Sequence, residues 1–141
     1  LLVAETGSYR IIKVWLDETR NGQQDVIIDN LPGFPDNIVG NGSGRFWIGL
    51  VAPRDSILDS LSQLPLLRKV AQRLPSFMRP QMQKFGHVFA INGNGKVITS
   101  LQDPEASYHS VTGAIEVGRW LYISSLFERK IARLNLSDIN L

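Results

Sequence analysis

The residues best suited to chemistry are Asp36 and Asn37, which stand side by side in the stretch 31–38, Leu-Pro-Gly-Phe-Pro-Asp-Asn-Ile. Its two prolines fix the backbone φ angle and its glycine permits a bend. The stretch therefore predicts a stiff corner that presents both side chains at the mouth of a strand starting at Ile38. Carboxylate and amide oxygens suit a hard cation, but Ca²⁺ takes about six to eight oxygens, so these two supply only part of a site. The alternative is a turn in which both side chains cap backbone amides.

Other catalytic patterns are missing from the sequence. The chain has no cysteine, which excludes disulfides and thiolate zinc sites. It also has no Gly-x-Ser-x-Gly nucleophile motif. The run Asn-Gly-Asn-Gly at 92–95 precedes a β-forming run rather than a helix, so it predicts a hairpin turn and not a phosphate-binding loop. We expect the three tryptophans, which fall in β-forming runs, to lie in the core: Trp15, Trp47 and Trp120.

Length and charge narrow the class of protein. A chain of 141 residues fits one domain with a sizeable core. The net charge of +2 is too small to indicate a nucleic-acid-binding protein. No run approaches the roughly 18 apolar residues of a membrane helix, and no signal peptide is visible. The chain begins in a β-forming run without methionine, so we expect an incomplete protein and assign no compartment.

Short β-forming runs surround the candidate corner and predict an all-β fold. We expect strands at 1–5, 9–16, 25–30, from 38, 46–50, 86–92, 96–101, 111–117, 120–124 and 130–136. Segment 54–84 differs, because its apolar residues recur at helical spacing and it carries a net charge of +4. We interpret it as a helical insertion whose apolar face packs on the β-structure. A lid over a binding site that touches lipid is the alternative.

Three runs resemble one another: residues 1–5, 46–50 and 120–124. Aligning Val3, Ile48 and Ile123 gives intervals of 45 and 75 residues, and removing the 31 residues of segment 54–84 reduces the second interval to 44. A period near 45 with about four short strands per unit is typical of propeller blades. Closed propellers have roughly four to eight blades. The chain therefore predicts about three blades, near half of a ring, in one partial domain over residues 1–141.

Several of these runs together resemble the strictosidine synthase-like family, over nearly the whole chain. They are Leu-Val-Ala-Glu-Thr-Gly with Tyr-Arg-Ile, Leu-Pro-Gly-Phe-Pro-Asp-Asn-Ile, Phe-Trp-Ile-Gly-Leu and Leu-Tyr-Ile-Ser-Ser-Leu. Relatives of that family include the adipocyte plasma membrane-associated proteins and, more distantly, the gluconolactonase and paraoxonase groups. The resemblance implies a six-bladed β-propeller, of which this chain forms the later blades. The remaining blades are expected from a missing part of the chain or from another copy.

The resemblance also implies roles for particular residues. In the gluconolactonase and paraoxonase relatives, the Asp that matches Asp36, followed in paraoxonases by an Asn that matches Asn37, binds a divalent metal in the central channel, with further ligands from earlier blades. We therefore expect a divalent metal, with calcium favoured, at Asp36 and Asn37 in the full-length protein. Strictosidine synthases use a glutamate on an inner strand, and the register places Thr112 at that position. Threonine cannot act as a carboxylate base near neutral pH, which disfavours a carbon–nitrogen lyase.

Two neighbours of Thr112 could contribute. Glu116 lies four residues further along, and we expect it near the strand end, facing solvent. His109 stands in the loop before the strand and could line the channel mouth and contact substrate, although a loop histidine is usually solvated.

Three functions follow from these expectations. The first is a metal-dependent hydrolase of lactones or aryl esters acting on a small molecule. The second is the carbon–nitrogen lyase. The third is a non-catalytic binding propeller that touches a membrane through segment 54–84.

Overall fold

The computed structural model describes residues 1–55, 83–139 and 141 and contains three antiparallel β-sheets. The first sheet has the order β1-β2-β3 (Leu2–Glu5, Arg10–Val14, Gln24–Ile28). The second has the order β4-β5-β6-β7 (Gly33–Gly40, Arg45–Pro53, Gly86–Asn92, Val97–Asp103). The third has the order β8-β9-β10 (Val111–Val117, Trp120–Ser125, Ala132–Asn135). Two short 3-10 helices, η1 (Thr6–Ser8) and η3 (Leu136–Asp138), complete the described elements.

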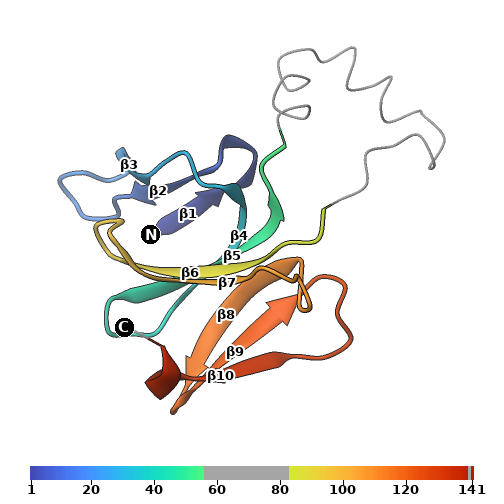
Figure 1. Cartoon of the computed structure of the whole chain (residues 1–141). Helices are drawn as coiled ribbons and strands as arrows, with labels where there is room; N and C mark the ends of the chain where they lie inside the picture. Colours follow the sequence, from blue (N-terminus) through green and yellow to red (C-terminus); the bar gives the residue numbers. More distant parts are fainter. Residues whose placement is uncertain (56–82, 140) are drawn as a thin grey trace, which may run out of the picture.

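The second sheet lies between the other two, as Figure 1 shows. Strand β6 is buried on both faces, and its side chains alternate between them. Phe89 and Ile91 belong to the core shared with the first sheet, whereas Val88 and Ala90 belong to the core shared with the third. A continuous apolar run in a central strand therefore serves two interfaces at once.

The three sheets repeat one unit. The aligned residues Val3, Ile48 and Ile123 each pair with the strand that follows, opposite Ile12, Phe89 and Ala132. Strands β1, β5 and β9 are thus equivalent, as the period of about 45 residues predicted. Successive antiparallel sheets stacked face to face form part of a β-propeller, which confirms the all-β prediction. Within the described residues, the first sheet has no counterpart of β4 and the third has none of β7.

The loops that lead into and out of the strands of the candidate site lie together at one edge of the sheets. Backbone hydrogen bonds join Leu31 N to Tyr9 O, Arg54 N to Pro32 O, Ser110 N to Phe85 O and Leu126 N to Ser110 O. We call this edge the insertion rim, and it comprises residues 6–9, 29–32, 54–55, 83–85, 104–110 and 126–131. In Figure 1 the grey trace leaves and rejoins the sheets at this rim. Strands β4 and β8, the first strands of the second and third sheets, both begin there. We call these two the inner strands.

Several expectations meet the structure differently. The helical insertion predicted over 54–84 falls almost wholly outside the described residues. Trp47 is buried, as expected, but Trp15 and Trp120 lie half-exposed, each with two basic side chains over its ring, so the expectation of a core position was wrong for these two. No helix in residues 1–55 or 83–139 has the length and apolar character needed to span a bilayer.

Candidate functional site

Asp36 and Asn37 lie in a β-bulge of strand β4. Pro35 pairs with Leu50 and Ile38 pairs with Ile48, so two residues of β4 stand opposite the single residue between those partners. The predicted strand start at Ile38 was therefore wrong, because β4 begins at Gly33 and continues through the bulge. Pro35 is tolerated within it because β4 is an edge strand of its sheet. Bulges re-aim side chains, so this one gives the candidate residues an orientation that regular pairing would not.

Thr112 occupies the same place in strand β8. Ile48 pairs with Ile38 and the aligned Ile123 pairs with Ala114, so Ala114 is equivalent to Ile38. Counting back two residues in each strand makes Thr112 equivalent to Asp36. The pairing of β8 with β9 also shifts register at this point, between Val111 and Gly113. The two candidate positions, chosen for different reasons, are thus one structural position in neighbouring blades.

The two bulges are in contact. Asn37 Nδ2 donates a hydrogen bond of 3.2 Å to the carbonyl oxygen of Thr112. Gly49, on β5 opposite the first bulge, allows this approach, since a Cβ atom there would lie 2.4 Å from the carbonyl carbon of Thr112. Gly113 makes a second, less tight approach to Asn37, whose Cβ would be 3.2 Å from an added Cβ. Glycine at two positions therefore brings the inner strands together.

The Asp36 carboxyl group is the most available acid of this region. It is half-buried, and within the described part of the chain it makes no hydrogen bond or ion pair. Burial raises the pKa of Asp36 above its ordinary value because the charged form loses hydration. A carboxylate without a compensating partner gains most from a cation. The donor set therefore fits a divalent ion as one part of its coordination shell.

The described residues do not complete such a site by themselves. No group of three or more His, Asp or Glu side chains suited to a metal occurs among residues 1–55 and 83–139. Asp36 and Asn37 offer at most three side-chain oxygens, whereas Ca²⁺ takes about six to eight. Any further ligands must come from outside these residues.

Thr112 makes its own hydrogen bonds. Its Oγ1 lies 2.8 Å from Ser124 Oγ, which also donates to the carbonyl of Gly113 at 3.2 Å. Sequence reasoning did not single out Ser124, although it directly follows the aligned Ile123. The hydroxyl pair provides polar contacts but no carboxylate, so the position can orient a ligand and cannot act as a general base near neutral pH.

His109 stands at the insertion rim, three residues before Thr112. Its Nδ1 lies 3.1 Å from Ser110 Oγ, and its Nε2 lies 3.4 Å from Glu128 Oε1. Ser125 Oγ also donates to the His109 carbonyl at 2.6 Å. The imidazole is therefore held by named partners. Glu128 was not predicted as a partner because it lies on the next connection, 19 residues away.

Glu116 corrects an expectation. It does not face solvent: its carboxylate accepts hydrogen bonds from Arg45 Nη1 at 2.8 Å, Trp47 Nε1 at 2.7 Å and Asn41 Nδ2 at 3.1 Å. Burial by itself would raise the pKa of Glu116, but these three donors outweigh it and hold the pKa below the ordinary value. The residue joins the second and third sheets, and its three donors and lowered pKa make it a poor substitute base for Thr112.

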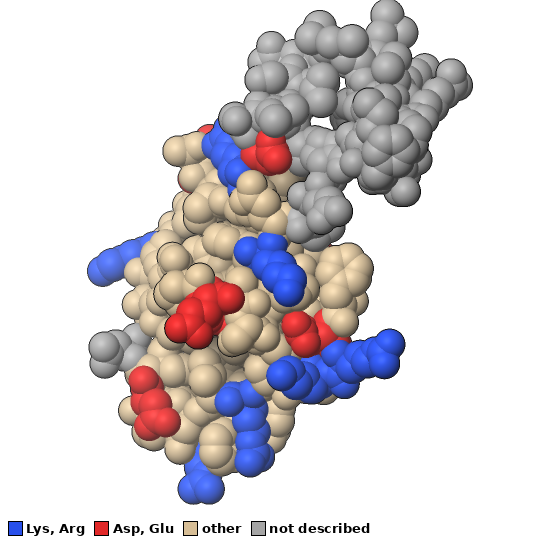
Figure 2. Space-filling model, turned by 45° about the vertical axis from the view of Figure 1, so that its right-hand side comes forward, with Lys and Arg blue, Asp and Glu red and all other residues tan. Residues whose placement is uncertain are grey.

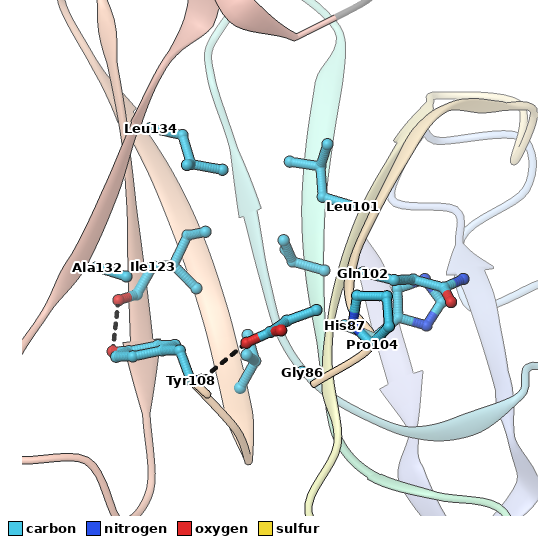
Figure 3. Close-up of a pocket in the computed structure, with 12 residues that line it drawn as sticks. Gly86, His87, Leu101, Gln102, Pro104, Tyr108, Ile123, Ala132 and Leu134 are labelled. Atoms are coloured by element: carbon cyan, nitrogen blue, oxygen red, sulfur yellow. Dashed lines mark hydrogen bonds between the residues drawn. The ribbon is translucent and has the colours of Figure 1, made fainter. Parts of the chain in front are cut away.

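Two cavities adjoin the third sheet. One of about 380 Å³ starts at Asn37 and runs along β8 and β9, with Ser124 and Tyr122 among mainly aliphatic neighbours. The other, of about 340 Å³, opens between the second and third sheets, and Figure 3 shows Tyr108 across it from Leu101 and Gln102. The Tyr108 hydroxyl donates to the carbonyl of Ile123 at 2.9 Å, and its backbone N–H donates to Asp103 at 2.9 Å. Only the first cavity touches the candidate site.

Comparison with known proteins finds relatives over nearly the whole chain. The chain is 35% identical to a bovine (Bos taurus) adipocyte plasma membrane-associated protein, over 96% of this chain and 35% of that protein. It is 34% identical to the Danio rerio protein of the same name, over 99% of this chain and 35% of that protein. The Arabidopsis thaliana protein STRICTOSIDINE SYNTHASE-LIKE 13 is 33% identical, over 73% of this chain and 27% of that protein. No family model matches. The chain thus spans about a third of the length of these relatives.

Proposed function

Because the chain belongs to the strictosidine synthase-like family, we propose that the full-length protein is a divalent-metal-dependent hydrolase of lactones or aryl esters. Asp36 and Asn37 would supply two of the metal's oxygen ligands, with calcium the favoured ion. The metal would polarise the substrate carbonyl or activate a water molecule. The further ligands, and the rest of the ring, would come from outside these residues.

One observation carries this proposal: the Asp36 carboxyl group is half-buried on the inner edge strand and has no partner within the described chain. A structural role would normally supply such a group with donors, as Glu116 demonstrates. The adjacent cavity beside Asn37 offers room for a small substrate. Thr112 and Ser124 would contact substrate through their hydroxyl groups, and His109 would stand above them at the insertion rim.

The test measures hydrolysis of a lactone and aryl-ester panel by the full-length protein, with and without a chelator and with Ca²⁺ added back. Asp36→Ala and chelation should each lower kcat/KM by about 100-fold or more, because the site loses its ion. Glu18→Ala removes an exposed acid at the opposite edge and should leave kcat/KM unchanged. Activity that is indifferent to both Asp36→Ala and chelation would overturn the proposal.

The structure counts against the lyase alternative. Thr112 replaces the family's glutamate, its hydroxyl is paired with Ser124, and the nearby Glu116 is saturated by three donors. Within residues 1–55 and 83–139, neither position 112 nor Glu116 therefore supplies the free carboxylate that the family's glutamate provides. Condensation of tryptamine with an aldehyde should be undetectable in the wild-type protein, and its detection would require another proton-handling residue.

The name of the mammalian and fish relatives favours a second candidate function, association with a membrane. We keep segment 54–84 as the contact proposed from sequence, because its net charge of +4 would favour an anionic surface. Deleting residues 56–82 from the full-length protein should then reduce its binding to vesicles, and unchanged binding would remove this segment from the proposal.

A further inference from the structure

We propose that the loop 126–131 between β9 and β10 is a contact site for anionic lipid at a membrane surface. The proposal does not rest on the hydrolase function, although Ile131 of this loop also lines the cavity beside Asn37. It also differs from the contact proposed for segment 54–84, since every residue involved is described by the structure.

The loop exposes three large apolar side chains within six residues. The exposed fractions are 56% for Leu126, 59% for Phe127 and 71% for Ile131. Single exposed apolar residues are common on protein surfaces, whereas clusters at one loop mark contact sites. Because the neighbouring Leu121 and Ile123 are buried, the loop follows directly from a strand that has already completed its part of the core.

Hydrogen bonds fix the backbone that carries these side chains. Ser125 Oγ accepts from the backbone N–H groups of Phe127 at 3.2 Å and Glu128 at 3.1 Å. The Tyr108 hydroxyl lies 2.9 Å from the carbonyl oxygens of both Lys130 and Ile123, so its one proton is shared between them. The apolar side chains are therefore held outward by the fold itself, so binding would require little further ordering of the loop.

The charges of the loop favour an anionic surface. Arg129 and Lys130 are exposed, whereas the single acid of the loop, Glu128, is turned to His109 at 3.4 Å. Figure 2 shows basic and acidic side chains interspersed over a mostly uncharged face, without one continuous basic area. Two cations in the loop attract an anionic surface by only about 1 kcal/mol each, so apolar insertion must contribute. Apolar residues flanked by Lys and Arg are the pattern of segments that lie in the membrane interface.

The arrangement defines how the lipid would be bound. Leu126 and Phe127 would enter the boundary between headgroups and acyl chains, while Arg129 and Lys130 contact lipid phosphates. The same rim carries both ends of segment 54–84 and the start of the inner strands. A membrane bound there would lie at the edge of the sheets where strands β4 and β8 begin.

The test is co-sedimentation of the full-length protein with vesicles, at low and at high salt. Neutral vesicles contain phosphatidylcholine alone, and the anionic vesicles used as probe contain about 30% phosphatidylserine in addition. The wild type should bind the anionic vesicles and release from them as salt rises. Leu126→Ser with Phe127→Ser should weaken binding by about tenfold or more. Arg129→Gln with Lys130→Gln should weaken it by roughly tenfold and remove most of the salt dependence.

A matched control removes similar apolar surface from the opposite edge. Leu16 and Val117 are 67% and 55% exposed, and Leu16→Ser with Val117→Ser should bind as the wild type does. Equal binding by the loop variant and this control would overturn the proposal. So would a loop variant that changes the oligomeric state in light scattering while vesicle binding stays the same, because the loop would then contact protein.

A second measurement does not depend on tolerance of the double substitutions. The chain contains no cysteine, so Phe127→Cys can carry a single environment-sensitive fluorophore, with Leu16→Cys as control. Anionic vesicles should shift the emission of the label at 127 to shorter wavelength and leave the label at 16 unchanged. No shift at 127, or equal shifts at both positions, would overturn the proposal.

Discussion

Two half-buried carboxylates, Asp36 on β4 and Glu116 on β8, lie on neighbouring inner strands and behave in opposite ways. Glu116 accepts three hydrogen bonds and its pKa is lowered; Asp36 has no partner in the described chain and burial raises its pKa. The difference lies in what faces each group. Trp47 and Arg45 of β5 reach Glu116 across the interface between sheets, whereas no donor of the described chain reaches Asp36, which lies in the bulge.

The comparison separates a structural acid from one that is open to a ligand. A partly buried carboxylate that serves the scaffold accepts hydrogen bonds from other strands, as Glu116 does, whereas the Asp36 carboxylate depends on the water that it keeps. Glu116 therefore belongs to the scaffold and Asp36 to the candidate site. Substitutions at and around the two residues test this distinction.

The largest effect is expected from Gly49→Ala, which removes the close approach on which the inner strands depend. The added methyl would lie 2.4 Å from backbone atoms of Thr112, and the chain must shift at a cost of about 3 kcal/mol. Denaturant titration measures the free energy of unfolding. Gly7→Ala is the matched control, because its methyl meets nothing within 4 Å; equal losses in the two variants would contradict the role of Gly49.

Glu116→Gln should cost about 2 kcal/mol of unfolding free energy, since Arg45 would keep its charge without a counter-ion. The same contacts set the pH dependence. A carboxyl group whose folded pKa is lowered stabilises fully above its unfolded pKa, and this contribution is lost as pH falls through the folded pKa. Acid titration of stability should therefore show a loss below about pH 4.5 that Glu116→Gln lacks. Glu105→Gln replaces an exposed acid and should leave the loss of stability at acidic pH unchanged.

Thr112→Val should cost about 1 kcal/mol, because Ser124 loses its hydroxyl partner. Combining it with Ser124→Ala in a double-mutant cycle should return a coupling energy of similar size. Strictly additive losses would mean that the two hydroxyls act independently. Thr112 would then not be stabilised by a partner within the chain, as Glu116 is.

The smallest effect has the opposite sign. Asp36→Asn should raise stability at neutral pH by about 0.5 kcal/mol in the absence of metal, because it removes a poorly hydrated charge. The folded pKa of Asp36 is raised, so its ionisation destabilises the fold and stability falls as pH rises through that pKa. The variant should lack this fall. Thermal unfolding with added Ca²⁺ should show stabilisation of the wild type and none of Asp36→Asn; a destabilised Asp36→Asn would give Asp36 a structural role.

Much of the fold follows from local patterns. The runs Gly86–Asn92 and Val111–Val117 form strands with the predicted bounds. The predicted turn at 92–95 forms with Gly95 at φ +82°, a value that glycine adopts freely. The spacing of Val3, Ile48 and Ile123 is enough to indicate the repeat. Each of these features depends on residues close in sequence or on a repeated pattern.

The site required the three-dimensional fold. The equivalence of Asp36 and Thr112 depends on two bulges, and a bulge changes register in a way that alternation of apolar and polar residues does not reveal. Glu116 was expected in solvent because its donors Arg45 and Trp47 lie 71 and 69 residues away. His109 was expected in a loop, and Glu128 joined it only through the packing of two connections at the insertion rim.

The strands and turns can be predicted from the amino-acid sequence because they depend on backbone preferences and side-chain alternation that act over a few residues. The period of about 45 residues and the family can also be predicted, because they follow from repeated and recognisable runs of sequence. Tertiary packing determines that the Glu116 carboxylate accepts hydrogen bonds and that the Asp36 carboxylate has no partner in the described chain. That outcome depends on which donors from other strands reach each carboxylate and on how much water each one keeps, and packing between sheets determines both.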